Sequence, residues 1–552
     1  MDKKEQRYRR MRNVAIVAII IVLIAIIINL APNYVKNFNT GKMTVIINNQ
    51  DVTDSMKANP YVGDNDVIYV STKDIANFFD HNIYYDNVYN QILTSSETKL
   101  AALPIDEKEM YVNSSKVKIS GSATEKDEMF YLPFSEMDDV YNIQVNYYAS
   151  TNTLTVDSLD KEQKKGNASK DVDIKYRPTI FSKTVDTVKQ GNSVIVIAQR
   201  DDGWIKVRTN NGQIGYTKDV TNIYTVRENM EDKKQVDGKI SLVWDYYTVY
   251  APDRSGTTID GVNVVSPSFI ELEEMGKGEI IDKIGADGQD YINWAHQNGY
   301  KVWAMVSNNS YYETTTEILN DYKLREKFIN NVVNAALQYN LDGINLDFEY
   351  VLKSNKDVYT RLIIELAPRL KEYGKVLSVD VTAPDGSDDW SECYDRNEIG
   401  KVADYVVFMA YDQYGSTSSK AGTTAGADWV DLSVDKFINR DEVPAEKIIL
   451  GMPFYTRIWE ESDELDSDAI YMSSVEKYIP AGVTKEWKDD VKQYYVEYEK
   501  NGATYKMWIE DERSLNAKFD IMDKYNLAGA GYWQKGFEDD SIWNLVKQRI
   551  NK

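Results

Sequence analysis

The strongest constraint on the fold is an alternation of short apolar runs with longer amphipathic stretches from about Asp237 onward. Repeated strand–helix units of this kind build a parallel sheet covered by helices. Eight units predict an α/β domain of the (β/α)8, or TIM, barrel type. The gap 456–527 holds a further strand-like run and predicts an α+β insertion. The predicted strands are 239–246, 261–269, 300–308, 343–350, 375–384, 405–412, 447–455 and 529–536.

The run LDGINLDFEY, residues 341–350, combines an apolar strand with three acids and an amide. Side chains of a strand alternate between its faces, so Asn345, Asp347 and Glu349 share one face. In a barrel that face points inward, with Glu349 nearest the C-terminal mouth and Asp342 deeper, at the strand's start. An internal polar plug or a solvated strand end would explain one acid. For three, we favour a catalytic row, because a glutamic acid with a raised pKa can protonate a glycosidic oxygen.

Composition argues against several classes of function. The chain has 64 basic and 87 acidic residues, a net charge of −23, which is unsuited to a nucleic-acid partner. Its one cysteine, Cys393, leaves no internal disulfide and no cysteine-rich metal site. Its two histidines, His81 and His296, are too few for a copper or non-haem iron site, and we expect His296 to be structural. We therefore expect an enzyme that works through carboxylates, aromatics and amides, without metal or cofactor.

The N-terminal segment predicts a membrane anchor. Residues 1–12 contain six cationic side chains and are followed by the apolar run Val14–Ile28. That length lies between a signal-peptide core and a membrane span. No small-residue cleavage site follows, so we favour an uncleaved single-pass transmembrane anchor at 13–31. The positive-inside rule then makes 1–12 a cytoplasmic basic tip and the remaining domains extracellular. The low cysteine count suits a bacterial surface without disulfide dependence, and we expect the cell membrane and surface of a Gram-positive bacterium.

Two smaller modules are predicted between the anchor and the barrel. Residues 42–157 are β-rich and contain a gapless internal repeat, in which 67–96 aligns with 129–158 as strand, short helix and hairpin. This α+β repeat module resembles the copper amine oxidase N-terminal-like domain, although one histidine cannot support copper chemistry. A polar linker is predicted at 158–172. Residues 173–226 resemble a bacterial SH3-like domain, a small β-barrel that would act as a spacer or a wall-binding module.

The barrel sequence resembles family 18 glycoside hydrolases. DGINLDFE matches the D-x-x-D-x-D-x-E signature of that family, with Asn345 where a second aspartate is common, and MAYDQYG and GYWQKG resemble two further strands. The resemblance implies substrate-assisted catalysis, in which the 2-acetamido oxygen of the substrate attacks the anomeric carbon. It assigns Glu349 as the acid and then the base, and Asp347 as the group that holds the acetamide. Tyr411 would donate a hydrogen bond to the acetamide oxygen. The candidate substrate-binding residues are Asp342, Asn345, Asp412, Trp533, Trp303 and Tyr455.

We therefore expect a membrane-anchored, extracytoplasmic hydrolase that cleaves a glycan polymer containing β-linked N-acetylglucosamine, either peptidoglycan or a chitin-like chain. The alternative is a non-catalytic glycan-binding or cell-wall-binding surface protein, and a third reading is a scaffold whose N-terminal modules carry its role. The presence of Glu349 favours the enzyme. The sequence leaves open the glycan, endo or exo action, the effect of Asn345 on activity, processing of the anchor, the ligands of the N-terminal modules and the oligomeric state.

Overall fold

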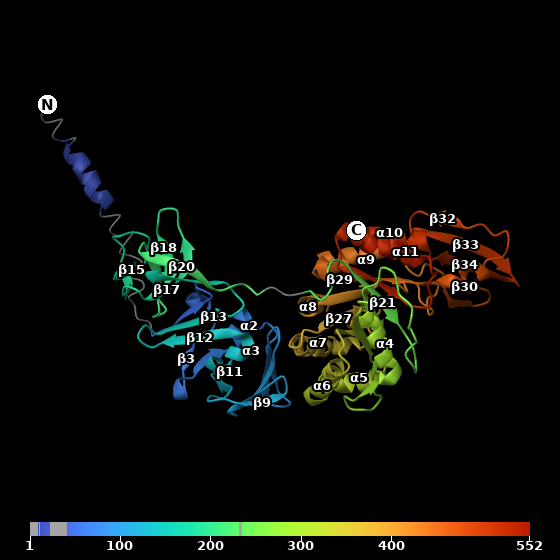
Figure 1. The fold of residues 1–552 in the computed structure, drawn as a ribbon, viewed down its shortest axis with the longest axis horizontal. Helices are drawn as coiled ribbons and strands as arrows, with labels where there is room; N and C mark the ends of the chain where they lie inside the picture. Colours follow the sequence, from blue (N-terminus) through green and yellow to red (C-terminus); the bar gives the residue numbers. More distant parts are fainter. Residues whose placement is uncertain (1–8, 10, 23–40, 231–233, 552) are drawn as a thin grey trace. The chain divides into compact units, whose positions relative to one another are not determined.

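The computed structural model describes residues 9, 11–22, 41–230 and 234–551 and is drawn in Figure 1. Residues 9 and 11–22 are helical. Within these described ranges, no helix has both the length and the apolar character needed to cross a membrane. The predicted anchor, 13–31, continues beyond them, so its residues 23–31 lie outside the described part. The chain divides into two compact units, 1–94 with 101–232 and 95–100 with 233–552.

The first unit begins with the two copies of the internal repeat. Each copy runs strand, short helix and hairpin, as the sequence predicts: β4, α2 and β5–β6, then β11, α3 and β12–β13. Apolar residues of both copies, including Ile75, Leu132 and Val156, share one core. The elements are β1 (Thr44–Ile47), β2 (Gln50–Asp51), β3 (Tyr61–Val62), β4 (Ile68–Ser71), α2 (Thr72–Phe78), β5 (Tyr84–Asp86), β6 (Gln91–Ser95), β7 (Leu100–Pro104), β8 (Glu109–Val112), β9 (Ser115–Lys118), β10 (Thr124–Lys126), β11 (Met129–Pro133), α3 (Asp138–Tyr141), β12 (Ile143–Tyr148) and β13 (Thr153–Ser158).

The SH3-like part of the first unit is a seven-stranded sheet in the order β16-β15-β19-β18-β17-β14-β20. Its strands alternate apolar and polar residues, and the apolar set, including Ile174, Val194 and Val207, forms a small separate core. The strands are β14 (Gln163–Ala168), β15 (Val172–Lys175), β16 (Thr184–Val188), β17 (Ser193–Gln199), β18 (Ile205–Arg208), β19 (Ile214–Thr217) and β20 (Val220–Arg227).

The prediction of a linker at 158–172 is wrong, because β14 lies there and pairs antiparallel with β17 and β20. Its sequence, QKKGNA, is polar except at Gly166 and Ala168, which are its buried residues. A Cβ on Gly166 would lie 2.5 Å from Val220 Cγ1, so this close approach requires glycine. Because the inward-facing residues of β14 are small and the others are polar, its composition resembles that of a linker, which explains the wrong prediction.

The second unit contains the predicted barrel. Eight parallel strands close in the order β21-β22-β25-β26-β27-β28-β29-β35, with β35 pairing back to β21. All eight were predicted from the sequence. They are β21 (Ile240–Asp245), β22 (Val264–Pro267), β25 (Lys301–Ser307), β26 (Gly343–Asp347), β27 (Val376–Val381), β28 (Tyr405–Met409), β29 (Ile448–Pro453) and β35 (Gly529–Trp533). A short hairpin of β23 (Ile270–Leu272) and β24 (Ile280–Asp282) extends the sheet beside β25.

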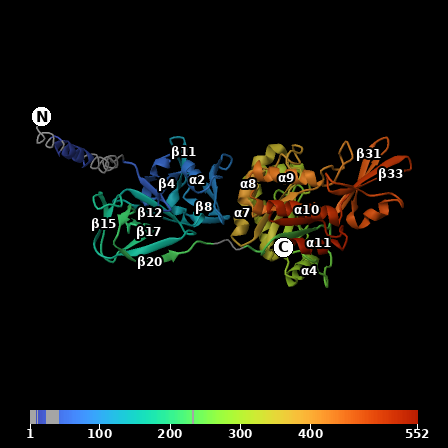
Figure 2. The ribbon, with the colours of Figure 1, turned by 90° about the horizontal axis from the view of Figure 1, so that it is seen from above.

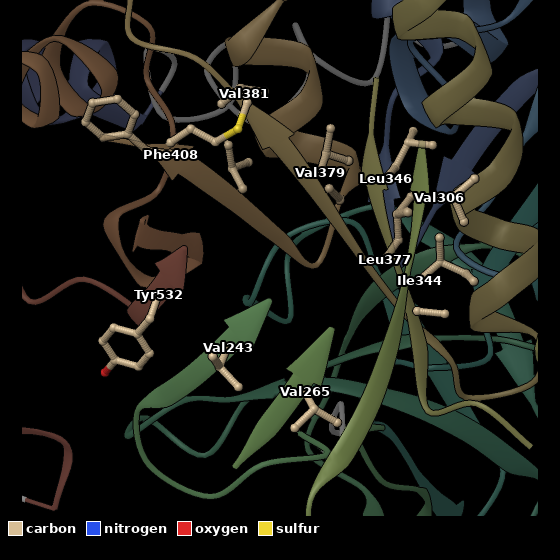
Figure 3. Close-up of a cluster of buried hydrophobic side chains, with 14 of the residues drawn as sticks. Val243, Val265, Val306, Ile344, Leu346, Leu377, Val379, Val381, Phe408 and Tyr532 are labelled. Atoms are coloured by element: carbon tan, nitrogen blue, oxygen red, sulfur yellow. The ribbon is translucent and has the colours of Figure 1, made fainter. Parts of the chain in front are cut away.

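Helices surround the strands in the manner of a TIM barrel (Figures 1 and 2). The apolar outer faces of the strands pack beneath them; Figure 3 shows side chains of this layer, among them Ile344 and Leu346 of β26. A separate apolar cluster, including Trp303 and Val407, fills the barrel interior. The helices are α4 (Gly285–Gln297), α5 (Tyr312–Asn320), α6 (Tyr322–Gln338), α7 (Lys356–Lys371), α8 (Arg396–Val402), α9 (Ala427–Asn439), α10 (Glu512–Tyr525) and α11 (Ile542–Ile550).

The predicted insertion follows β29. It is a five-stranded antiparallel sheet in the order β31-β30-β34-β33-β32 with its own apolar core, and it projects to one side of the barrel in both views (Figures 1 and 2). A buried ion pair between Glu510 and Lys518, at 2.8 Å, joins the end of the insertion to α10. The strands are β30 (Tyr455–Glu461), β31 (Leu465–Tyr471), β32 (Glu486–Lys488), β33 (Gln493–Lys500) and β34 (Ala503–Ile509), with the 3-10 helix η6 (Met472–Tyr478).

Candidate active site

The C-terminal end of β26 carries two carboxyl groups into the barrel mouth. Asp347 is the last residue of β26 and Glu349 follows two residues later, so their side chains share the inward face. Asn308, just after β25, holds this segment in place. Its Nδ2 donates to the backbone oxygen of Glu349 at 2.9 Å, and its Oδ1 accepts from the backbone nitrogen of Glu349 at 3.1 Å. Because Asn308 is buried, water does not compete for these two hydrogen bonds.

A pocket of about 130 Å³ lies over these carboxyl groups. Its walls come from the ends of successive barrel strands, where active sites of TIM barrels are built. It brings together six of the nine predicted site residues and four others. The lining residues are Asp347, Glu349, Asp380, Thr382, Trp390, Met409, Tyr411, Asp412, Tyr455 and Trp533.

Burial changes the proton affinity of the acids in this pocket. It raises the pKa of Glu349 to about 7, and the negative charge of Asp412 acts in the same direction. It also raises the pKa of Asp347 well above the ordinary carboxyl range, with further contributions from Glu349 and Asp380. A carboxyl group with a pKa near 7 can both give and take a proton near neutral pH. Glu349 therefore has the properties of a general acid and base.

Two tyrosines line the pocket beside the acids: Tyr411, two residues after β28, and Tyr455, at the start of β30. Tyr411 is buried, which raises the pKa of its hydroxyl well above the ordinary range, so the group stays protonated and can donate a hydrogen bond. The hydroxyl of Tyr455 donates to Asp412 Oδ1 at 2.8 Å, and Arg457 Nη2 lies 3.4 Å from the same oxygen. The side chain of Asp412 is 38% exposed. Its carboxylate is therefore held in place while still accessible to a bound ligand.

Trp533 forms an apolar wall of the pocket at the end of β35. Its ring centroid lies 5.8 Å from that of Trp244 and 6.0 Å from that of Tyr246. These contacts fix the plane of the indole. A flat aromatic face in a polar pocket suits the apolar face of a sugar ring.

Two predicted substrate-binding residues lie elsewhere, and those predictions are wrong. Trp303 is fully buried in the barrel interior, where its ring stacks on Tyr405 at 5.3 Å. Asp342 precedes β26 at the opposite end of the strand. Its carboxylate accepts from the backbone nitrogen of Val302 at 3.0 Å and contacts Lys301 and His296. Both residues lie too deep in the barrel to line the pocket.

Asn345 also lies beneath the pocket and does not line it, so its assignment to substrate binding is wrong. Its side chain is fully buried among polar groups. Its Oδ1 accepts from Trp244 Nε1 at 2.8 Å and Ser266 Oγ at 3.0 Å. Its Nδ2 donates to Ser378 Oγ at 3.1 Å and Asp380 Oδ1 at 2.5 Å. The carboxyl partner of Asn345 is therefore Asp380 of the neighbouring strand β27.

Four pocket residues were not predicted: Asp380, Thr382, Trp390 and Met409. A signal was available for two of them. Ser378, Asp380 and Thr382 alternate along the predicted strand 375–384 in the same way as the acids of β26, and this polar series marks an inward face. Trp390 lies in a long connection after β27, where no periodicity identifies a pocket residue.

No metal centre is evident in the described part of the chain, where no three His, Cys, Asp or Glu side chains are grouped so as to hold an ion. Cys393 is a buried free thiol, and burial raises its pKa to about 12. A thiol of that kind is a poor nucleophile. The reactive groups of the pocket are therefore its carboxyl and hydroxyl groups.

The chain is similar in sequence to two bacterial proteins named as a glycosylase and a lytic enzyme, and similar in fold to a chitinase. The chain is 25% identical over 298 residues to "Uncharacterized glycosylase YvbX" of Bacillus subtilis, covering 52% of this chain and 84% of that protein. It is 26% identical over 250 residues to "Cortical fragment-lytic enzyme" of Bacillus anthracis, covering 43% of this chain and 56% of that protein. The crystal structure of a chitinase from Chromobacterium violaceum shares the fold with a TM-score of 0.50 and 22% identity, covering 57% of this chain and 99% of that one.

Family models account for three parts of the chain. Residues 46–156 match the copper amine oxidase N-terminal domain, and 171–218 match the bacterial SH3 domain, as the sequence resemblance implied. Residues 242–538, more than half of the chain, match glycosyl hydrolases family 18. The protein therefore belongs to glycosyl hydrolases family 18.

Proposed function

We propose that this hydrolase is anchored to the cell membrane outside the cytoplasm and cleaves β-linked glycans that contain N-acetylglucosamine. The observation that carries the proposal is the placement of Glu349 and Asp347 on one inward face, beneath a pocket that also presents Tyr411 and Trp533. Glu349 has a pKa of about 7, as a group that alternates between acid and base requires. The surrounding side chains suit a sugar that carries an acetamido group.

The proposed reaction uses the substrate as its own nucleophile. The sugar lies on Trp533, and its acetamide carbonyl oxygen attacks the anomeric carbon while Glu349 gives its proton to the departing glycosidic oxygen. The glycosidic bond breaks and a cyclic oxazolinium ion forms. Asp347 accepts a hydrogen bond from the acetamide N–H, and Tyr411 donates one to the acetamide oxygen. Glu349, now a carboxylate, takes a proton from water, whose oxygen attacks the same carbon and opens the ring. This mechanism retains configuration without a second catalytic carboxylate.

The nature of the site favours this route over attack by an enzyme carboxylate. Asp347 is the other acid on the inward face of β26, and it is 7% exposed. Burial raises its pKa well above the ordinary range, which makes it a weak nucleophile. A hydrogen-bonding role with the acetamide fits that environment.

Peptidoglycan and chitin-like chains are the proposed substrates, since both contain 2-acetamido sugars. One relative of this chain is named a cortical fragment-lytic enzyme and another similar structure is a chitinase. The bacterial SH3 domain and the N-terminal hydrophobic segment favour a wall polymer near the membrane. Peptidoglycan is therefore the first substrate to test.

The test is release of new reducing ends from purified peptidoglycan and from chito-oligosaccharides by the full chain, with mass spectrometry of the products. Glu349→Gln should lower kcat by about 10²- to 10⁴-fold, because the amide keeps the shape but cannot transfer a proton. Glu446→Gln, at an exposed position, is the matched control and should leave kcat unchanged. N-acetylglucosamine at the new reducing end would identify the bond cleaved. Glycan binding without release by the unmodified chain would instead support the non-catalytic glycan-binding alternative.

A further inference from the structure

A third inward carboxyl group, Asp380, belongs to β27 rather than to the acidic strand. It is 1% exposed and contributes to the floor of the pocket. Burying a carboxyl group costs free energy, because its charged form loses hydration. A carboxyl group kept in such a place calls for an explanation. The mechanism proposed above gives Asp380 no role.

Strand register places Asp380 beside Asp347. Asn345 of β26 pairs with Ser378 of β27, and Leu346 pairs with Val379. One further step along both strands reaches Asp347 and Asp380, whose side chains both point inward. Neighbouring strands lie about 4.8 Å apart. Two inward carboxyl groups side by side on neighbouring strands of a buried site favour a state in which one of them holds a proton.

Hydrogen bonding leaves Asp380 as the suitable proton partner of Asp347. Asn345 uses its carbonyl oxygen for Trp244 and Ser266. Its amide group donates to Asp380 Oδ1 at 2.5 Å, which holds that carboxyl group in place. An amide cannot exchange a proton with an acid. Asp347 Oδ1 is buried and has no hydrogen-bond partner in the described part of the chain.

We propose that Asp380 is a positioning residue that shares one proton with Asp347, supplying from β27 the second carboxyl group that Asn345 cannot provide from β26. This inference rests on the proposed function. In the free enzyme the proton is bound to Asp347. As positive charge develops on the acetamide nitrogen, the Asp347 O–H bond breaks and an Asp380 O–H bond forms. Asp347 is left as the carboxylate that accepts from the acetamide N–H. Hydrolysis of the cyclic ion reverses the transfer, so no proton is gained or lost.

The electrostatics of the pair agree with this assignment. Burial raises the pKa of Asp380 well above the ordinary range; the hydrogen bond from Asn345 opposes that rise and the charge of Glu349 adds to it. Burial likewise raises the pKa of Asp347, and Asp380 is one of the charges that act on it. One negative charge on the pair is easier to hold in this site than two.

The kinetic test compares Asp380→Asn with the exchange variant Asn345→Asp/Asp380→Asn, which moves the carboxyl group across the same hydrogen bond. Asp380→Asn should lower kcat about 10- to 100-fold with KM changed less than threefold, a size typical of residues that act through a neighbour. The alkaline limb of its pH profile should move to lower pH, because a negative charge near Glu349 is removed. In the exchange variant, most of the lost kcat should return, and the alkaline limb should move back to its position in the unmodified enzyme. Asp431→Asn, in the exposed ion pair with Lys524, is the control and should match the unmodified enzyme.

Either of two kinetic results would overturn the proposal. One is an Asp380→Asn variant with unchanged kcat and pH profile. The other is a loss that the exchange variant fails to restore. Because Glu349→Gln is assayed in parallel, a failure confined to Asp380 leaves the hydrolase mechanism intact.

A second measurement does not depend on turnover, so it tests the pair even if no offered glycan is cleaved. Melting temperatures of Asp347→Asn, Asp380→Asn and the double variant are compared from pH 4 to 8. When the pKa of a carboxyl group is higher in the folded than in the unfolded chain, the fold is favoured while pH is below the unfolded-state pKa, and this contribution is lost as pH rises. Asparagine has no such pH dependence. Each single variant should therefore melt higher than the unmodified chain at pH 8 and at the same temperature at pH 4. If the two residues share one proton, the double variant should gain little beyond either single variant. Additive gains would show that the two acids titrate independently, which contradicts the proposal.

Discussion

At the scale of single residues, the pocket shows how position along one strand gives chemically similar side chains different properties. Asp342, Asp347 and Glu349 all belong to one ten-residue stretch. Asp342 contacts Lys301 and His296 at the base of the barrel. Asp347 and Glu349 both line the pocket, and Asp347 is buried whereas Glu349 is partly exposed. Only the last combines a raised pKa near 7 with access to a ligand.

Asp412 should set the pH range of activity through Glu349. Burial is the main cause of the raised pKa of Glu349, and the charge of Asp412 adds to it. Asp412→Asn removes that charge, so the pKa of Glu349 should fall and the alkaline limb of kcat/KM should move from about pH 7 to lower pH. Profiles of kcat/KM against pH for the two proteins provide the measurement. An unchanged limb would mean that the charge of Asp412 does not contribute to the pKa of this acid.

At the scale of elements, barrel closure depends on a glycine in the last strand. Gly529 of β35 pairs with Ile240 of β21 on one side and Ile449 of β29 on the other. A Cβ at this position would lie 1.9 Å from the backbone oxygen of Ile240, and backbone cannot move aside as a flexible side chain can. The two strands would have to separate at the seam that closes the barrel.

Gly529→Ala should therefore lower the free energy of unfolding by about 2–3 kcal/mol, a size typical of overpacking in a tightly packed interior. Urea unfolding followed by circular dichroism gives the measurement. Gly415→Ala is the matched control, because a Cβ there has open space around it and should be tolerated. Equal stability of the two variants would show that the β21–β35 seam can adjust.

The pattern of residues along each strand determined which parts of the barrel and its pocket could be predicted from the sequence. The eight barrel strands were found because their outer faces are continuously apolar, and the row in β26 was found because alternation assigns each side chain to a face. The sequence placed Asp342 deeper than Glu349 but did not show how far below the barrel mouth the pocket extends. Trp303 is the third residue of β25 and Asp342 precedes β26, so both lie below the pocket. The alternation of Ser378, Asp380 and Thr382 marked an inward face of β27, but only strand register shows that Asp380 lies beside the acidic strand, where it accepts from Asn345.

At the scale of the whole molecule, the hydrolase barrel is joined to two modules that do not contribute to its pocket. The pocket is lined entirely by residues of the second unit, from Asp347 to Trp533. The repeat module and the SH3-like sheet each have their own core. The modules therefore have cores of their own and supply no residue to the pocket.

The proposed placement at the membrane predicts a clear effect of charge in the apolar run Val14–Ile28. Ile20→Lys/Ile21→Lys puts two cations near its centre, and each costs about 3 kcal/mol in a membrane-spanning helix. In fractionated cells, the unmodified chain should stay with the membrane after an alkaline carbonate wash, and the lysine variant should not. The control, Ile20→Leu/Ile21→Leu, keeps the segment apolar and should remain in the membrane fraction. Recovery of the unmodified chain in the wash would show that the segment does not anchor it.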